Sequence, residues 1–211
     1  MTDVWSERAG AYRDAADQRE GADLDLLVSW AEGRTALDVA TGGGHTARRL
    51  REAGFDVVTL DPAPGMGADV IARAEDIPFA DASFDVVTCR IAPHHFEDVR
   101  RAAAEMARVS RALVLIEDTL YEDETVEEAE RLRDPTHVRS YSEDEWRALL
   151  EGAGLTVDES RVVEKRRPVD KWLARAGCEG EEAERVKELL APHVEDGHYV
   201  DRKILLKARK R

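Results

Sequence analysis

The chain has 211 residues, of which 43% are hydrophobic, and carries a formal net charge of −14. This length suits one well-packed domain rather than two, so we expect residues 1–211 to form a single domain. The excess of acidic residues argues against a nucleic-acid partner. The sequence shows neither the apolar core of a signal peptide nor an apolar run of about 20 residues that could span a membrane. We therefore expect a cytoplasmic protein.

The first half of the chain alternates between segments typical of helices and of strands. Two helices are expected at 3–20 and 24–32, where apolar residues recur every three to four positions. They precede the sheet, so residues 1–34 are expected to form a helical lid. Strands are then expected at 36–40, 56–60, 69–72 and 84–89, with helices at 46–53 and 99–109. This βαβ order predicts a parallel sheet in an α/β fold, with residues 35–120 as its cofactor-binding core.

The second half continues the pattern with longer helical stretches. Ser142 and Glu145 have the spacing of a capping box and indicate the start of a helix. The expected strands are 112–117, 156–163 and 199–207, and the expected helices are 124–133, 142–152, 168–176 and 181–190. The sheet is therefore predicted to have seven strands. Residues 121–211 are expected to supply the acceptor-side helices and the C-terminal strands.

The stretch TALDVATGGGHTARRL, residues 35–50, predicts a ligand site. A strand, a glycine turn and the start of a helix expose backbone amides, and Gly42 and Gly44 allow close approach because they lack a Cβ atom. Asp38 stands ahead of the glycines, where a carboxylate repels phosphate and attracts an ammonium group. S-adenosylmethionine carries an ammonium and a sulfonium and has no phosphate. Asp38 therefore favours this ligand over a dinucleotide.

Four stretches resemble the class I S-adenosylmethionine-dependent methyltransferases. They are LDVATGGGHTA, VVTLDPAPGM, AEDIPFADASFDVVTCRIAPHHFEDV and RLRDPTHVRSYSEDEW, which lie between residues 37 and 155. The chain is most similar to the small-molecule branch that includes the ubiquinone/menaquinone C-methyltransferases. The resemblance implies a Rossmann-like three-layer sandwich with a seven-stranded, mostly parallel sheet. It also implies methyl transfer from S-adenosylmethionine to a small-molecule acceptor by in-line displacement.

The resemblance assigns the expected cofactor site residue by residue. Asp38 would hold the amino end of the cofactor through the loop or water, and the carboxylate of Asp61 would take the two ribose hydroxyls. Ala40 replaces the first glycine of the common family pattern. Arg73 offers only donors to the adenine amino group, so the Ala74 amide is the preferred adenine contact. The remaining cofactor-binding residues implied are Tyr12, Gly42, Gly44, Pro62, Glu75 and Arg90, which directly follows the strand 84–89.

Two histidines are the candidate catalytic residues. His94 and His95 follow the fourth expected strand, whose carboxyl end faces the ligand crevice in open α/β sheets. A histidine is a suitable base for an acidic acceptor, and His95 is expected to be the inward one. The alternative is that one histidine packs or caps the next helix while the other is exposed. His137 could line the acceptor pocket or belong to a turn built by Asp134 and Pro135.

Other assignments remain open at the level of sequence. The segment between Asp61 and Ala74 is short, so the helix usually found after the second strand is expected to be truncated or missing. The histidines and the two cysteines lack metal-ligand spacing, so no metal is expected. A small-molecule acceptor is the expected partner, and the chain is expected to be a monomer or homodimer. The competing functions are a non-catalytic S-adenosylmethionine-binding protein, an NAD-type oxidoreductase and an RNA methyltransferase.

Overall fold

The computed structural model describes residues 4–211, so the expected helix start at Asp3 lies outside it. The strands form one mixed sheet in the order β3-β2-β1-β4-β5-β8-β6, with β7 paired to β8. Strands β1 to β5 are parallel, and β8 runs antiparallel to both β5 and β6. The bounds are β1 (Thr35–Val39), β2 (Asp56–Asp61), β3 (Val70–Ile71), β4 (Phe84–Arg90), β5 (Ser110–Thr119), β6 (Leu155–Pro168), β7 (Val194–Glu195) and β8 (His198–Lys210). The predicted α/β class and mostly parallel sheet are confirmed.

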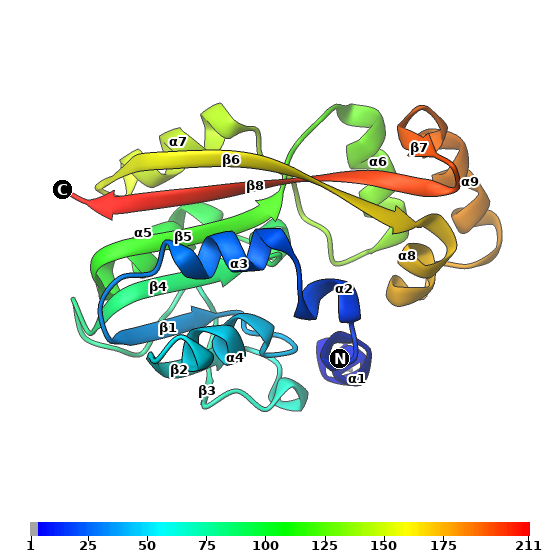
Figure 1. Ribbon diagram of the computed structural model, residues 1–211. Coiled ribbons are helices and arrows are strands. Elements are labelled where there is room, and N and C mark those ends of the chain that lie inside the picture. The colour runs from blue at the N-terminus through cyan, green and yellow to red at the C-terminus, as the bar shows by residue number, and fades with distance from the viewer. Residues whose placement is uncertain (1–3) are drawn as a thin grey trace.

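Helices cover both faces of the sheet (Figure 1). Helices α3 (Ala22–Ser29) and α4 (His45–Glu52) lie on one face, and α5 (Val99–Val109) and α7 (Glu143–Gly152) lie on the other. Alternate residues of a strand point to opposite faces. Accordingly, Leu37 belongs to the apolar cluster under α5 and α7, whereas Ala36 belongs to the cluster under α3 and α4. The two clusters hold the ends of the central strands in fixed positions.

Side-chain caps define where several helices begin. The Asp98 carboxylate accepts a hydrogen bond from the Arg101 amide at the start of α5. Ser142 and Glu145 form the predicted capping box of α7. Such caps satisfy amides that have no partner inside the helix. The observed bounds of α5 and of α6 (Glu124–Arg133) coincide with the expected ones.

The structure corrects the N-terminal prediction. The expected helix 3–20 is two helices, α1 (Val4–Arg13) and α2 (Ala16–Arg19), which are separated at residues 14–15. The expected loss of the helix after β2 is confirmed, because only the short 3-10 turn η1 (Pro64–Met66) lies between β2 and β3. Helix α1 packs on η1, where Ala9 meets Ala63 and Met66. Part of the N-terminal segment thus occupies this side of the molecule.

The strands β6 and β8 are longer than expected and extend past the end of β5 (Figure 1). Their extension carries α8 (Val169–Ala176) and α9 (Gly180–Leu190), which pack with α6 around a separate apolar cluster. The two-residue strand β7 was not predicted. Two further 3-10 turns, η2 (Pro93–His95) and η3 (Ala191–His193), follow β4 and α9. Within residues 4–211, no helix is both long enough and apolar enough to cross a membrane.

Candidate functional site

A cavity of about 480 Å³ opens at the carboxyl ends of β1, β2 and β4. Its size falls within the range usual for small-molecule sites. The glycine turn after β1 forms one wall, and Asp61 at the end of β2 forms the next together with Pro62. Helix α1 contributes Trp5 and Tyr12, and η2 contributes His95. The crevice at this end of an open α/β sheet is where such folds bind ligands.

Asp61 is held in a fixed orientation at the cavity wall. Its Oδ2 accepts a hydrogen bond from the Gly42 amide at 2.9 Å, and its Oδ1 accepts one from the Ala63 amide at 3.0 Å. The first bond joins the end of β2 to the glycine turn after β1. A buried carboxylate held in this way presents paired acceptors, which is the chemistry that two vicinal hydroxyls require.

Asp38 lies beneath the glycine turn rather than in the cavity wall. Its Oδ2 accepts a hydrogen bond from the Thr41 hydroxyl at 2.6 Å, and its Oδ1 accepts one from the Thr88 hydroxyl at 2.8 Å. Burial raises the pKa of this carboxyl. Thr41 itself lines the cavity, so Asp38 reaches a ligand only through the loop. Gly44, the N-cap of α4, also lies outside the lining, whereas Gly42 and Gly43 belong to it.

The backbone at the strand ends adopts an unusual conformation. Ala40 after β1 and Ile91 after β4 both have a φ of 52°, a region in which residues other than glycine are strained. Both line the cavity. Gly42 has the same φ without that cost. The common family pattern has a glycine at this position. Ala40 takes its place and adopts the same kind of backbone conformation at the cost of strain.

The segment expected to contact adenine also lines the cavity. Ala74 and Glu75 are buried in its wall. The Arg73 guanidinium lies 3.3 Å from Glu75 and 3.2 Å from Glu97. These two carboxylates bind the donors of Arg73, which agrees with the preference for Ala74 as the adenine contact.

Arg90 lines the cavity but is also the centre of a buried ionic cluster. Its Nε donates to Glu117 and its Nη2 donates to Asp23, each at 2.5 Å. Its Nη1 donates to the carbonyl of Gln18 at 3.0 Å, and Lys165 forms a second ion pair with Asp23. Burial raises the pKa of Glu117 to about 7. The cluster ties the N-terminal helices to β4, β5 and β6, and nothing in the sequence predicted this role.

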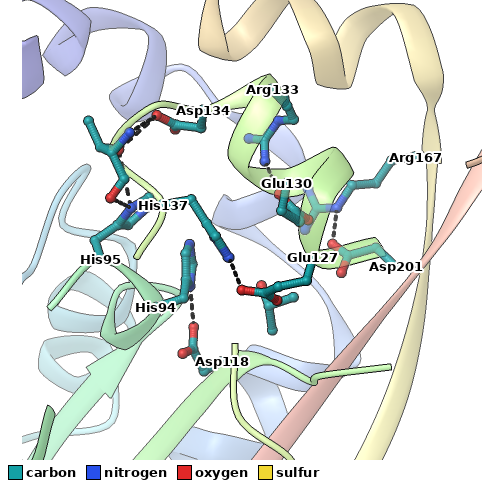
Figure 2. A network of polar contacts seen from close by, with 12 residues as sticks. His94, His95, Asp118, Glu127, Glu130, Arg133, Asp134, His137, Arg167 and Asp201 are labelled. Atoms are coloured by element: carbon teal, nitrogen blue, oxygen red, sulfur yellow. Dashed lines mark hydrogen bonds and ion pairs between the residues drawn. The ribbon is translucent and has the colours of Figure 1, made fainter. Parts of the chain in front are cut away.

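The two candidate histidines have different surroundings (Figure 2). His95 lines the cavity, whereas His94 lies behind it with its Nδ1 2.5 Å from Asp118 Oδ1. The two ring centroids are 4.0 Å apart, and the Trp5 ring meets His95 edge-on at 4.6 Å. Burial and the neighbouring His94 hold the pKa of His95 well below its ordinary value. His95 is therefore neutral near pH 7.

One nitrogen of His95 has a defined role. Its Nδ1 lies 3.0 Å from the carbonyl oxygen of Thr136, and a carbonyl can only accept. Nδ1 therefore donates its proton, which leaves Nε2 as the unprotonated nitrogen. Thr136 was not predicted as a site residue, although it belongs to the noted stretch around His137.

The loop that follows α6 is fastened to η2. The His94 carbonyl accepts hydrogen bonds from the Val138 and Arg139 amides at 2.9 and 3.1 Å. His137 Nε2 lies 2.8 Å from Glu127 Oε1, and His137 is not among the residues that line the cavity (Figure 2). The amide of His137 donates to the Asp134 carbonyl at 2.9 Å, which favours the turn interpretation.

Helix α1 covers the cavity through close backbone contacts. The Gly65 amide donates to Ser6 Oγ at 2.8 Å, and His45 Nε2 lies 2.9 Å from the Tyr12 carbonyl oxygen. A Cβ atom on Gly43 would lie 2.6 Å from that same oxygen. Gly43 is therefore needed for close approach of the lid. Among the described residues, no group of histidines, cysteines and acids is arranged to hold a metal ion.

Comparisons with known proteins agree with this architecture. Residues 12–160 match a family model described as a methyltransferase domain. The uncharacterized methyltransferase YcgJ of Bacillus subtilis is 33% identical, over 88% of this chain and 82% of its own length. Its crystal structure has a TM-score of 0.79, with 30% identity, over 90% of this chain and 98% of that chain.

Two further relatives extend the comparison. A putative methyltransferase from Bacillus halodurans has a TM-score of 0.76 and 31% identity, over 90% of this chain and 99% of that chain. The demethylmenaquinone methyltransferase of Renibacterium salmoninarum is 39% identical, over 40% of each chain. The structures share the fold along almost the whole chain, whereas the quinone enzyme matches only part of it.

Proposed function

The chain belongs to the methyltransferase domain family, and from that premise we propose that it transfers a methyl group from S-adenosylmethionine to a small-molecule acceptor. The observation that carries the proposal is that one cavity contains both the oriented Asp61 carboxylate and the neutral His95 ring. The first group suits the cofactor, and the second suits an acceptor that must lose a proton.

The residues of the cavity fit S-adenosylmethionine. Asp61 would take the ribose hydroxyls, and the Ala74 amide and the apolar side of Met66 would meet the adenine. The carboxylates of Asp61 and Glu75 favour a cationic ligand. When bound, S-adenosylmethionine supplies an electrophilic methyl group on its sulfonium.

The same charges count against the NAD-type alternative. A pyrophosphate on the glycine turn would lie above the buried Asp38 carboxyl and beside Asp61. Arg90, at the end of β4, contributes a positive side chain to the cavity wall, but this side chain is bound to Glu117 and Asp23. An anionic cofactor therefore finds less electrostatic support here than a cationic one.

His95 would act on the acceptor. In the tautomer set by the Thr136 carbonyl, Nε2 accepts the proton that an O–H, N–H or acidic C–H acceptor loses. Trp5 and Tyr12 would cover the reacting groups and exclude water. The acceptor must be held in line, since positioning provides most of the rate enhancement in such a displacement.

A screen of phenols, enols, amines and acidic carbon compounds tests the proposal through the release of S-adenosylhomocysteine. We expect turnover with at least one class, and a large loss of turnover in His95→Gln with unchanged cofactor affinity. His198→Gln, on β8 outside the cavity lining, is the matched control. Cofactor binding without turnover by any acceptor class would instead support the non-catalytic alternative.

A further inference from the structure

A continuous chain of polar contacts leads from the lid to His95. Arg8 on α1 donates through Nη1 to both carboxylate oxygens of Asp134, at 3.1 and 3.2 Å. The Thr136 hydroxyl lies 2.7 Å from Asp134 Oδ1 and 3.2 Å from His95 Nδ1. Figure 2 shows Asp134 and His95 connected through this loop. Asp134 is itself buried, with 2% of its surface exposed.

The direction of each hydrogen bond in this chain is determined by chemistry. Arg8 only donates, and it holds the buried Asp134 in its ionised form. An ionised carboxylate only accepts, so the single hydroxyl hydrogen of Thr136 must point to Asp134. The Thr136 oxygen then offers only lone pairs to His95 Nδ1. Both the carbonyl and the hydroxyl of Thr136 therefore accept from the same N–H group.

We propose that Asp134 and Thr136 are positioning residues that hold His95 in the tautomer with a proton on Nδ1. Neither residue needs to contact the acceptor. Without Asp134, the Thr136 hydroxyl could turn and donate to Nδ1, which would place the proton on Nε2 and remove the base. The arrangement resembles the general use of a third group to orient a catalytic histidine, with a hydroxyl inserted between acid and imidazole.

The pKa of Asp134 agrees with this assignment. The Thr136 hydroxyl and amide both donate to this carboxyl, and together with the nearby Arg8 they lower its pKa to about 2 despite burial. Asp134 is therefore ionised at every pH at which the protein would work. Arg8 also donates to the Ala176 carbonyl at 2.8 Å. The packing of α1 therefore places the Arg8 cation beside Asp134.

The catalytic consequence rests on the proposed function, but the tautomer can be measured without any methyl transfer. Long-range ¹H–¹⁵N correlation spectra distinguish the two ring nitrogens of each histidine. In the full-length protein, we expect His95 to show a protonated Nδ1 and an unprotonated Nε2. Asp134→Ala frees the Thr136 hydroxyl to donate to Nδ1 and should move His95 toward a mixture of tautomers. Thr136→Val keeps the carbonyl acceptor and has no hydroxyl to donate, so it should keep Nδ1 protonated, as should Thr136→Ser.

Activity provides the second readout. Loss of one hydrogen bond to the base predicts a decrease of roughly 3- to 10-fold in kcat for Thr136→Val, with the affinity for S-adenosylmethionine unchanged. Thr136→Ser should restore kcat. If Asp134→Ala does not fold, Asp134→Asn, whose amide NH2 group can donate to the Thr136 hydroxyl, gives the tautomer comparison instead.

The two proposals fail in different ways. An Nδ1-protonated His95 in folded Asp134→Ala or Asp134→Asn, identical to the parent protein, would overturn the positioning role. A mixture of tautomers in the Asp134 variants, combined with no turnover of any acceptor by the parent, would uphold the positioning role and overturn the proposed function.

Discussion

The Asp61 carboxylate accepts a hydrogen bond from the Gly42 amide at 2.9 Å, which joins the end of β2 to the turn after β1. The two elements that the proposed cofactor would bridge are thus tied together by the protein itself. Preorganisation of this kind lowers the cost of ordering a site on binding. The amides and the carboxylate would otherwise have to be oriented by the ligand itself.

Asp61→Ala is expected to weaken binding of S-adenosylmethionine. The change removes two charge-assisted hydrogen bonds, each worth roughly 1.5–3 kcal/mol, so the Kd should rise by about a hundredfold or more. Calorimetric titration measures the change. Asp56→Asn, at the opposite end of the same strand, is the matched control and should leave the Kd unaltered. An unchanged Kd in Asp61→Ala would remove Asp61 from the cofactor site.

The pH dependence of turnover should reflect the environment of His95. Burial and His94 lower its pKa, so the neutral ring that accepts a proton persists as the pH falls through about 6.5, the ordinary value for histidine. We therefore expect His95 to become protonated only at a lower pH than an ordinary histidine does. An NMR titration that places its midpoint at pH 6.5 or above would contradict this environment.

Gly43→Ala should displace the lid. Its new Cβ atom would lie 2.6 Å from the Tyr12 carbonyl oxygen and 2.9 Å from His45 Nε2, closer than atoms can approach. We expect faster hydrogen exchange in residues 4–13 of this variant. Gly152→Ala is the control, because nothing lies within 4 Å of the corresponding atom in α7. Equal exchange in both variants would show that α1 does not rest on Gly43.

Glu117→Gln should alter the pH dependence of stability. Burial raises the pKa of Glu117 to about 7, so the folded state binds a proton that the unfolded state releases near pH 4.3. This difference in proton binding stabilises the folded state below about pH 4.3, and the stabilisation is lost as the pH rises through about 7. Glutamine does not titrate, so Glu117→Gln avoids this loss. Between pH 5 and pH 8, the unfolding free energy of the variant should therefore increase relative to that of the parent protein. Urea titrations that give a constant difference would refute the raised pKa.

Removal of the cation in the same cluster should be far more damaging. Arg90→Leu would leave Asp23 and Glu117 buried without their shared partner. Breaking one side of a buried ion pair typically costs about 3–5 kcal/mol, so the urea midpoint should fall sharply. Arg48→Leu, which breaks an exposed pair with Glu52, is the comparison and should cost little. Similar small losses in both variants would contradict a structural role for Arg90.

Local features of the sequence predicted much of the fold. The bounds of α5 and α6 and the capping box at Ser142 depend on residues close together in the chain. The short connection after β2 was likewise readable from spacing alone. Asp61 was placed by its position at the end of β2 and His95 by its position after β4, and both line the cavity.

Features that depend on distant contacts were missed. The partners of Arg90 lie 67 and 27 residues away, and an Arg at the end of a strand carries no sign of them. Thr136 meets His95 across 41 residues. The extension of β6 and β8 follows from their pairing with each other, which no single segment reveals. Such relationships come from topology and packing rather than from periodicity.

The most direct test of the central claim is calorimetric titration of the purified protein with S-adenosylmethionine and, separately, with NADH, in low and high salt. We predict micromolar binding of S-adenosylmethionine and no binding of NADH in either condition. Binding of NADH alone, or of neither ligand by a protein shown to be folded, would contradict it.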